Sequence, residues 1–243
     1  KVRFLINISH ELRTPLTLIH APLKQLMDKL TADNENYPLI QSICKQSERM
    51  KNILNTVLNV RKMEVGQSTL HIQSIQLDEW AEQLISDFKP EASVRGITLV
   101  YQPEPEIQTL CFDKEKCTTI LTNLLINALK YTPDESTISI STRLSEDKRV
   151  RISISDQGPG LKDVDTNNLF VRFYQGNNSR PGTGIGLSYS KILVEQHGGN
   201  IGAYDNKNFG SPGATFWFEL PLNTEPGNIT LHPQEYLNTL LAP

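Results

Sequence analysis

His10 is the residue near the start of the chain that is best suited to chemistry. Apolar residues recur every seven positions around it, which predicts a helix whose apolar stripe leaves His10 on the outer, solvent-facing side. A histidine with an ordinary pKa near ~6.5 is largely neutral at pH 7, and the neutral imidazole is a nucleophile. Glu11 follows directly, and Thr14 lies one turn further along the same face. Taken alone, a histidine such as His10 is more often an ordinary surface residue than a site of chemistry.

A second group of polar residues follows one side of a helix expected over 113–131. The group consists of Lys116, Asn123, Asn127 and Lys130. An asparagine oxygen is a suitable ligand for Mg²⁺, and a lysine suits phosphate. Asp113 stands where a helix N-cap is expected. The pattern therefore indicates either a ligand-binding face or a solvated helix face.

Two glycine-rich segments stand further along the chain. Asp156 to Gly160 ends an alternating strand, where a buried aspartate can accept a hydrogen bond from an exocyclic amine such as that of adenine. Gly182 to Leu187 opens a helix, where exposed N–H groups favour an anion. Taken alone, the first segment is more often a plain turn than a nucleotide site. The second is neither a Walker A loop nor a clean Rossmann fingerprint, so either segment alone is a weak signal. Their order after the asparagine helix indicates a nucleotide site, with the polar stretch 157–183 as a lid or a disordered loop.

The composition argues against several classes of protein. A net charge of −3 is unlike that of a protein that coats nucleic acid. Three cysteines without CxxC spacing and five histidines without metal-ligand spacing disfavour a disulfide scaffold and a zinc site. No stretch of the sequence reaches the ~18 apolar residues of a membrane span, and we expect no signal peptide in it. Because Lys1 already lies in a helical pattern, we expect a portion of a longer protein.

The elements that must position these residues fall into two parts. Residues 1–30 and 38–64 carry bundle-type apolar stripes, which predict an antiparallel helical hairpin that pairs with a second copy as a four-helix bundle. From about residue 70, strands mix with helices, which predicts an α+β sandwich with helices on one face. The expected domains are 1–66, 71–222 and a C-terminal tail or linker over 223–243. Strands are expected at 97–102, 109–112, 137–144, 150–155, 200–204 and 214–220, and helices at 77–95, 113–131 and 185–197.

Together these segments make the chain resemble the catalytic core of the sensor histidine kinases of two-component systems, over roughly residues 2–222. Five sequence boxes of that family are matched in order. They are the phosphoacceptor box at Phe4–Leu16, the N box at Asn123–Thr132, the first glycine box at Asp156–Gly160, the F box at Leu169–Tyr174 and the second glycine box at Gly182–Leu187. The resemblance implies a dimeric phosphoacceptor hairpin followed by a Bergerat-type ATP-binding sandwich of the histidine kinase/gyrase type.

The resemblance also implies roles for single residues. His10 is phosphorylated by ATP, Glu11 orients its ring or takes its proton, and Glu11 with Thr14 matches the family's phosphatase pattern. Asn127 holds Mg²⁺ and Asp156 reads the adenine amine. The nucleotide site that the resemblance implies consists of Asn123, Asn127, Lys130, Tyr131, Asp156, Gly158, Gly160, Phe170, Phe173, Gly182, Thr183, Gly184, Ile185, Gly186 and Leu187, with the two phenylalanines anchoring the lid. Ile185 departs from the leucine that is commoner at its position.

The implied function is autophosphorylation of His10 by ATP and phosphoryl transfer to an aspartate of a response-regulator receiver domain, in the cytoplasmic portion of an inner-membrane sensor. A hinge near residues 64–70 would let the ATP reach His10. Two alternatives stay open: a catalytically silent pseudokinase scaffold and a gyrase-like ATPase. Relatives that hydrolyse ATP place a glutamate four residues before the magnesium asparagine, and Asn123 occupies that position here, which favours transfer over hydrolysis.

Overall fold

The computed structural model describes residues 69–162, 164–172, 174 and 184–230, together with residues 18–19, 22–23, 25–27, 29, 34, 36–37, 39–44, 46–47 and 50. The chain divides into two compact units, Lys1–Gln67 and Ser68–Pro243. His10, Glu11 and Thr14 lie outside the described residues, and so do Phe173, Gly182 and Thr183. Their expected roles therefore stay predictions.

The described residues of the first unit are mostly helical. Several of their large apolar side chains are exposed: Leu18, Ile19, Leu26, Leu39, Ile43 and Met50. Exposed apolar side chains on a helix are typical of a surface that packs against another protein surface. The predicted pairing of this unit with a second copy of the chain stays a prediction.

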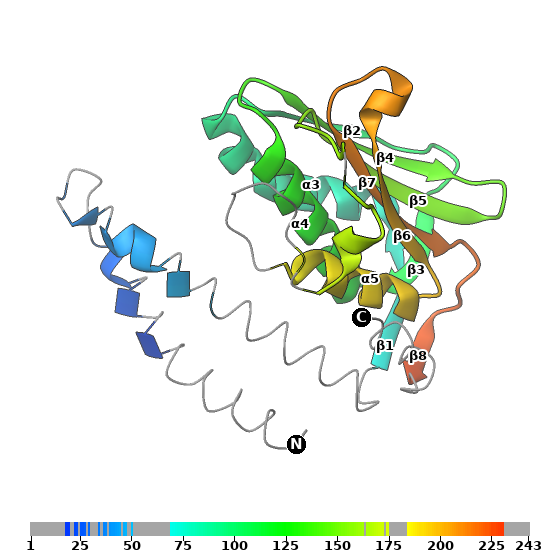
Figure 1. The fold of residues 1–243 in the computed structure, drawn as a ribbon. Helices are drawn as coiled ribbons and strands as arrows, with labels where there is room; N and C mark the ends of the chain where they lie inside the picture. Colours follow the sequence, from blue (N-terminus) through cyan, green and yellow to red (C-terminus); the bar gives the residue numbers. More distant parts are fainter. Residues whose placement is uncertain are drawn as a thin grey trace. The chain divides into compact units, whose positions relative to one another are not determined.

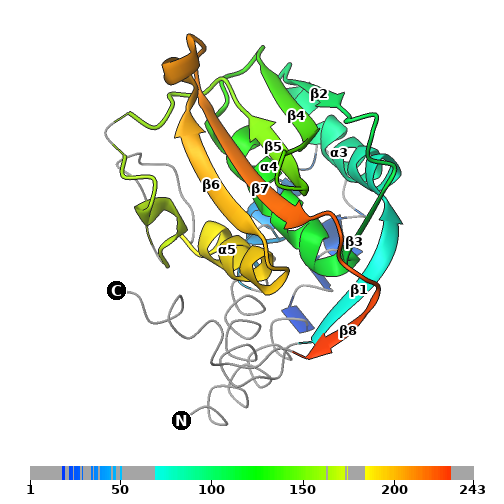
Figure 2. The ribbon, with the colours of Figure 1, turned by 90° about the vertical axis from the view of Figure 1, so that its right-hand side faces the viewer.

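The second unit is built on a five-stranded sheet that carries its helices on one face (Figures 1 and 2). The strand order is β2-β4-β5-β7-β6, with β2 at Thr98–Gln102, β4 at Thr137–Leu144, β5 at Arg149–Ser155, β7 at Ala214–Pro221 and β6 at Asn200–Asp205. The helices are α3 at Leu77–Val94, α4 at Lys114–Tyr131 and α5 at Gly186–Gln196. The predicted α+β architecture is confirmed for this unit, and each predicted strand and helix boundary lies within about two residues of the observed one.

Strict alternation of side chains produces this one-sided arrangement. In β4 and β5, Ile138, Ile140, Ile152 and Ile154 are at most 1% exposed, while the serines between them lie on the opposite face. Side chains along a strand alternate between the two faces of the sheet, so the isoleucines all face the helices. The helices α4 and α5 bury apolar faces of their own against the sheet, so the hydrophobic core lies between the two layers.

A separate three-stranded sheet, in the order β3-β1-β8, was only partly foreseen. Its strands are β1 at Thr69–Gln76, β3 at Thr109–Asp113 and β8 at Gly227–Thr230. The expectation of a tail or linker after Leu222 is therefore wrong for 227–230, where β8 pairs antiparallel with β1. β1 and β8 were both missed because they gain their order from pairing with a distant strand, which local patterning does not report.

His197 joins the carboxyl end of α5 to the start of α4. Its Nδ1 lies 2.7 Å from the Leu193 carbonyl oxygen and donates to it, which leaves Nε2 to accept from the Asp113 backbone N–H at 3.2 Å. The Cys117 thiol lies 3.8 Å from the same Nε2. Burial lowers the pKa of His197, so the neutral ring is the form that the fold stabilises.

The depressed pKa of His197 predicts a pH dependence of stability. At pH values between the pKa of His197 in the folded chain and its ordinary value of 6.5, the unfolded chain binds a proton more readily than the folded chain does. The stability that the neutral His197 ring contributes is therefore present above this pH range and is lost as the pH falls through it. We expect the free energy of unfolding to fall on acidification from pH 7.5 to 5.5, by no more than about 1.4 kcal/mol per pH unit for this one group. Urea denaturation followed by the fluorescence of Trp80 and Trp217, the chain's 2 tryptophans, reports on the second unit. The His197→Gln variant should lose part of that slope; identical slopes in both proteins would contradict the assignment.

Candidate functional site

Helix α4 forms the base of the site, and both of its ends are held. At its start the Asp113 carboxylate accepts from the Lys116 backbone N–H at 3.1 Å, which confirms the expected N-cap. Burial alone would raise the pKa of Asp113, but hydrogen bonds from the His71 N–H and from Lys116 outweigh it and lower the pKa. At the other end Arg95 donates to the Leu129 and Thr132 carbonyl oxygens, where a cation also complements the helix dipole.

Asp156 is a buried carboxylate at the end of β5, and it is 4% exposed. Its Oδ1 accepts from the backbone N–H groups of Gly158 at 2.7 Å and Ala214 at 3.2 Å. Burial raises the pKa of Asp156 in spite of these two donors. The second oxygen, Oδ2, has no hydrogen bond among the described residues, so it is left to accept from a ligand.

The loop after Asp156 lies directly against the end of α4. A Cβ built at Gly158 would stand 2.9 Å from the Tyr131 carbonyl oxygen, so only glycine allows this approach. Gly160 has a φ of +80°, and the Asp205 carboxylate accepts from the next backbone N–H, that of Leu161, at 2.8 Å. These contacts bring the first glycine box to Tyr131.

The start of α5 lies against the middle of α4. The Asn123 side-chain amide donates to the Gly186 carbonyl oxygen at 3.2 Å and to the Ser190 hydroxyl at 3.1 Å. Ile185 is the N-cap residue of α5, so Gly186 and Leu187 stand in its first turn, whose N–H groups have no partner within the helix. Gly184, with a φ of +66°, turns the chain into this position.

Asn127 lies one turn from Asn123 and one turn from Tyr131, between the two contacts just described. Its side chain is half-buried and makes no hydrogen bond to any residue that the structure describes. On the same stripe, the Lys130 ammonium donates to the Tyr131 hydroxyl at 3.0 Å. The half-buried Phe170 belongs to a short 3₁₀ turn, η1 at Asn168–Phe170, which packs beside α5.

Two residues that the sequence analysis did not single out hold Asp156 in place. Asn206, at the start of the 3₁₀ turn η2 (Asn206–Phe209), donates to the Asp156 carbonyl oxygen at 3.2 Å and accepts from the Thr215 hydroxyl at 2.7 Å. Gly213 has a φ of +90°, and a Cβ there would overlap the Asp156 carbonyl oxygen. The Pro-Gly pair before β7 was the available signal for Gly213. Asn206 had no local signal, because its partners are distant in sequence.

The described part of the site thus brings the expected residues to one helix. Asn123, Asn127, Lys130 and Tyr131 lie along α4, the Asp156–Gly160 loop meets its carboxyl end, and the start of α5 meets its middle. Phe173, Gly182 and Thr183 lie outside the described residues, so their place at the site stays a prediction.

Comparison with known proteins shows to which family the chain belongs. The model of the histidine kinase-, DNA gyrase B- and HSP90-like ATPases matches residues 112–224, and the model of the His Kinase A (phospho-acceptor) domain matches residues 1–66. The chain belongs to the sensor histidine kinases of two-component systems. The fold class expected from the resemblance, a phosphoacceptor hairpin followed by an ATP-binding sandwich, is confirmed.

Individual relatives agree. The sensor histidine kinase TmoS of Ectopseudomonas mendocina is 33% identical over 255 residues, which cover 98% of this chain and 26% of TmoS. This chain therefore spans about a quarter of the length of that relative. Full-length ShkA in complex with AMPPNP superposes with a TM-score of 0.75 at 24% identity, over 93% of this chain and 47% of ShkA. The histidine kinase ThkA in complex with the response regulator TrrA superposes with a TM-score of 0.63 at 23% identity, over 89% of this chain and 60% of ThkA.

The residues present fit an adenine nucleotide and its magnesium ion. A buried carboxylate whose Oδ2 has no hydrogen bond among the described residues suits an exocyclic amine, and the glycine at 158 lets the chain pass close to the carboxylate. The Asn127 amide oxygen is a neutral, hard ligand, so a Mg²⁺ ion there would be held chiefly by phosphate oxygens and water. No group of three acidic, histidine or cysteine side chains in the described ranges forms a metal cage. No helix in the described part of the chain has the length and apolar character of a membrane span.

The contact between Gly213 and Asp156 predicts a matched pair of variants. Gly213→Ala should lower the free energy of unfolding by more than the ~1–3 kcal/mol that a strained φ costs, because the new methyl group also displaces the Asp156 carbonyl. Gly210→Ala is the control, since Gly210 has a φ of +79° and nothing within 4 Å of its Cβ position, so only the strain applies. Urea denaturation of both variants tests the difference. Equal losses would show that the close approach at Gly213 has no energetic consequence.

Proposed function

We propose that this chain is the kinase portion of a two-component sensor: it binds ATP, transfers the γ-phosphoryl group to His10, and passes it to an aspartate of a receiver domain. The observation that carries the proposal is the convergence of Asp156, Asn127 and the start of α5 on one helix, in a chain that also holds a matched phosphoacceptor domain. A chain that combines a nucleotide site with a phosphoacceptor is suited to moving phosphate between them.

Adenine recognition is assigned to Asp156. Its Oδ1 is already occupied by two backbone donors, which fixes the orientation of the carboxylate before a ligand arrives. Its Oδ2 would then accept from the exocyclic amine of adenine. Guanine presents a carbonyl oxygen at the corresponding position, and two acceptors cannot pair, so the same geometry would select adenine.

The transfer step itself needs little covalent help from the protein. The neutral imidazole nitrogen of His10 attacks the γ-phosphorus, the bond from that phosphorus to the β,γ-bridging oxygen breaks, and ADP leaves with the electron pair. The imidazole proton is assigned to Glu11, which the family resemblance suggests as orienting group or base. Mg²⁺, when bound, neutralises charge on the β- and γ-phosphates. Correct orientation of the two reactants supplies much of the acceleration, of the order of ~7–11 kcal/mol.

Hydrolysis of ATP is disfavoured by the contacts of Asn123. A base that activates water would have to stand at this position, four residues before Asn127. Asn123 has no group that accepts a proton at neutral pH, and its amide is engaged with Gly186 and Ser190. These contacts support a structural role that ties α4 to α5, and they speak against the gyrase-like alternative.

The partner that we propose is a response-regulator receiver domain, with a second copy of this chain completing the helical bundle. The relative ThkA has been solved in complex with a response regulator, and the apolar side chains exposed on the first unit suit pairing between copies. Attachment of the parent protein to an inner membrane, with this portion on the cytoplasmic side, rests on the family resemblance alone and stays a prediction.

The phosphoacceptor is tested by labelling with [γ-³²P]ATP. The unaltered chain should acquire a label that is lost in acid and kept in base, as expected for a phosphoramidate. His10→Ala should acquire none, while its affinity for a non-hydrolysable ATP analogue, measured by calorimetry, stays within about twofold because the two sites are separate. A variant that is labelled as well as the parent would move the phosphoacceptor elsewhere. An unlabelled parent that binds ATP normally would favour the pseudokinase scaffold.

Adenine recognition is tested by replacing Asp156 with Asn. The asparagine oxygen would accept from the Gly158 and Ala214 N–H groups, which turns its N–H₂ toward the exocyclic amine of adenine. Two donors cannot pair, so affinity for the ATP analogue should fall about tenfold or more. Because the pKa of Asp156 is raised, the parent should also lose affinity on acidification at a pH above that of an ordinary carboxyl. Asp147→Asn, in the exposed turn before β5, is the control and should bind as the parent does. Unchanged affinity in Asp156→Asn would reject the assignment.

A further inference from the structure

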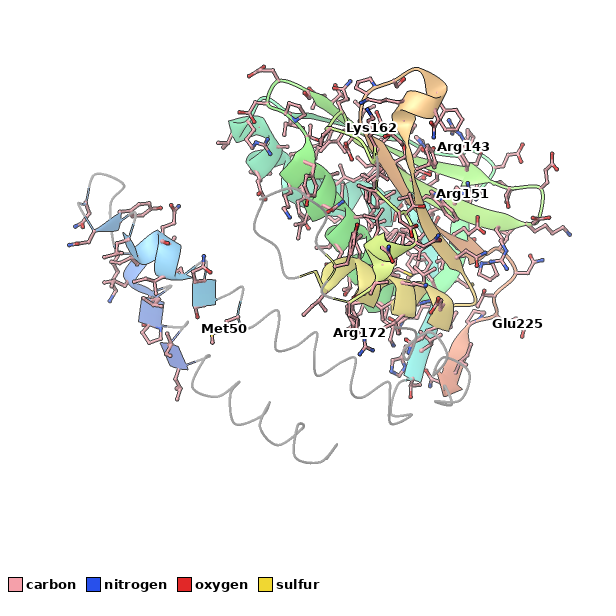
Figure 3. The ribbon with its side chains drawn as sticks, in the orientation of Figure 1. Met50, Arg143, Arg151, Lys162, Arg172 and Glu225 are labelled. Atoms are coloured by element: carbon pink, nitrogen blue, oxygen red, sulfur yellow. The ribbon has the colours of Figure 1, made fainter. Side chains whose placement is uncertain are left out.

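The face of the five-stranded sheet that turns away from the helices carries an open trough of about 610 Å³. It crosses the strands on the side opposite to α4 and α5. The ATP site proposed above shares with it the positioning residue Asn206, but no residue assigned to contact the nucleotide. In Figure 2 the strands β4, β5, β7 and β6 lie in front of α4, and Figure 3 labels Arg143 and Arg151 on this part of the sheet. A polar face of a sheet can be exposed to solvent without further cover. A hollow of this size in such a face arises from the sizes of the side chains that line it.

The floor of the trough is made by short hydroxyl side chains. Ser141 lies directly opposite Ser153 on the neighbouring strand, and Ser139 opposite Ser155. Ser139, Ser141 and Ser153 have no side-chain hydrogen bond to any described residue, so their hydroxyl groups are available as donors and acceptors. Small side chains on two adjacent strands lower the floor relative to the larger residues around it.

One end of the trough is positively charged. Arg143 and Arg151 are opposite each other across β4 and β5, and they are the charged residues that line the trough. Like charges in this position destabilise a sheet unless something compensates them. Arg151 is compensated, because it pairs with Glu219 at 2.9 Å and stacks over the Trp217 ring at 4.0 Å. Arg143 donates to the carbonyl oxygen of its own neighbour Thr142 and has no acidic partner among the described residues.

The other end of the trough is aromatic. Phe209, in η2, is 74% exposed and packs edge-on against the Tyr204 ring with centroids 5.3 Å apart. Both rings line the trough. A single exposed phenylalanine is common on protein surfaces. Phe209 differs because it lies in the same trough as Arg143 and Arg151, at the opposite end.

The strand register gives the separation of the two ends. Arg143 and Tyr204 lie three strand spacings apart across the sheet and four residues apart along it. These offsets correspond to about 14 Å and about 13 Å, a diagonal of roughly 20 Å. An extended chain advances about 3.3 Å per residue, so roughly six residues span it.

We propose that this trough binds an extended acidic segment of a partner protein, with a carboxylate at Arg143 and an apolar side chain on Tyr204 and Phe209 about six residues away. Charge complementarity carries the choice of partner: no acidic residue lines the trough, although the chain as a whole has a net charge of −3. The serine floor lets the peptide backbone and polar side chains of the segment form hydrogen bonds. Two arginines are too few for the phosphate contacts that hold nucleic acid on a protein of this charge.

Fluorescence anisotropy with a labelled octapeptide tests the proposal on the full chain. The probe carries three glutamates at one end and a phenylalanine at the other, and in the matched peptide glutamines replace the glutamates. We expect saturable binding of the acidic probe and a fall in affinity of roughly tenfold in Arg143→Glu, the loss expected when a charge-assisted hydrogen bond is removed. Phe209→Ala should weaken binding, and Ser153→Tyr should block it by filling the floor. Autophosphorylation should be unchanged in Arg143→Glu, since Arg143 lies on the face opposite to α4 and α5.

The control is Lys89→Glu, which changes the net charge by the same amount at an exposed position of α3. Equal losses in Arg143→Glu and Lys89→Glu would show a general charge effect and overturn the proposal. Binding of the glutamine peptide as tight as that of the acidic probe would overturn it as well. So would preferential binding of an octauridylate through Arg143, because it would assign the trough to nucleic acid.

Discussion

The site depends on keeping one carboxylate buried in a fixed orientation. A buried carboxylate is stable only where hydrogen-bond donors surround it, and Asp156 has two backbone N–H groups on a single oxygen. Both donors follow Asp156 in the chain, but Gly158 is only two residues away and Ala214, at the start of β7, is 58 residues away. Asn206 and Gly213 then hold the Asp156 backbone itself, so the loop that bears the carboxylate cannot turn away without breaking contacts in two other segments.

Helix α4 is the common frame against which the other parts are positioned. Its ends are fixed by Asp113 and Arg95, His197 ties its start to the end of α5, and Asn123 ties its middle to the start of α5. A helix held at so many points is a rigid platform, and groups on it keep their distances when a ligand binds. In the function proposed above, this fixed part of the site would supply the orientation on which phosphoryl transfer depends.

The two faces of the five-stranded sheet serve different purposes. Isoleucine and phenylalanine side chains pack one face against the helices and so support the nucleotide site indirectly. The opposite face needs no hydrophobic cover, which leaves its residues free to vary in size and charge, and a serine floor beside two arginines is one result. Strand alternation makes this division possible, because neighbouring residues in one strand belong to different environments.

Much of this protein was determined by local sequence. The alternating isoleucines of β4 and β5, the N-cap at Asp113 and the ordered boxes were enough to predict the sandwich and its main elements, and to single out candidate site residues, because each depends on neighbours in the chain. Tertiary structure decided what local patterns do not contain. It paired β8 with β1, where a linker was expected, placed His197 between two helices, and recruited Asn206 and Gly213 to Asp156. These features join segments tens of residues apart, and their energy exists only after the chain has brought those segments together.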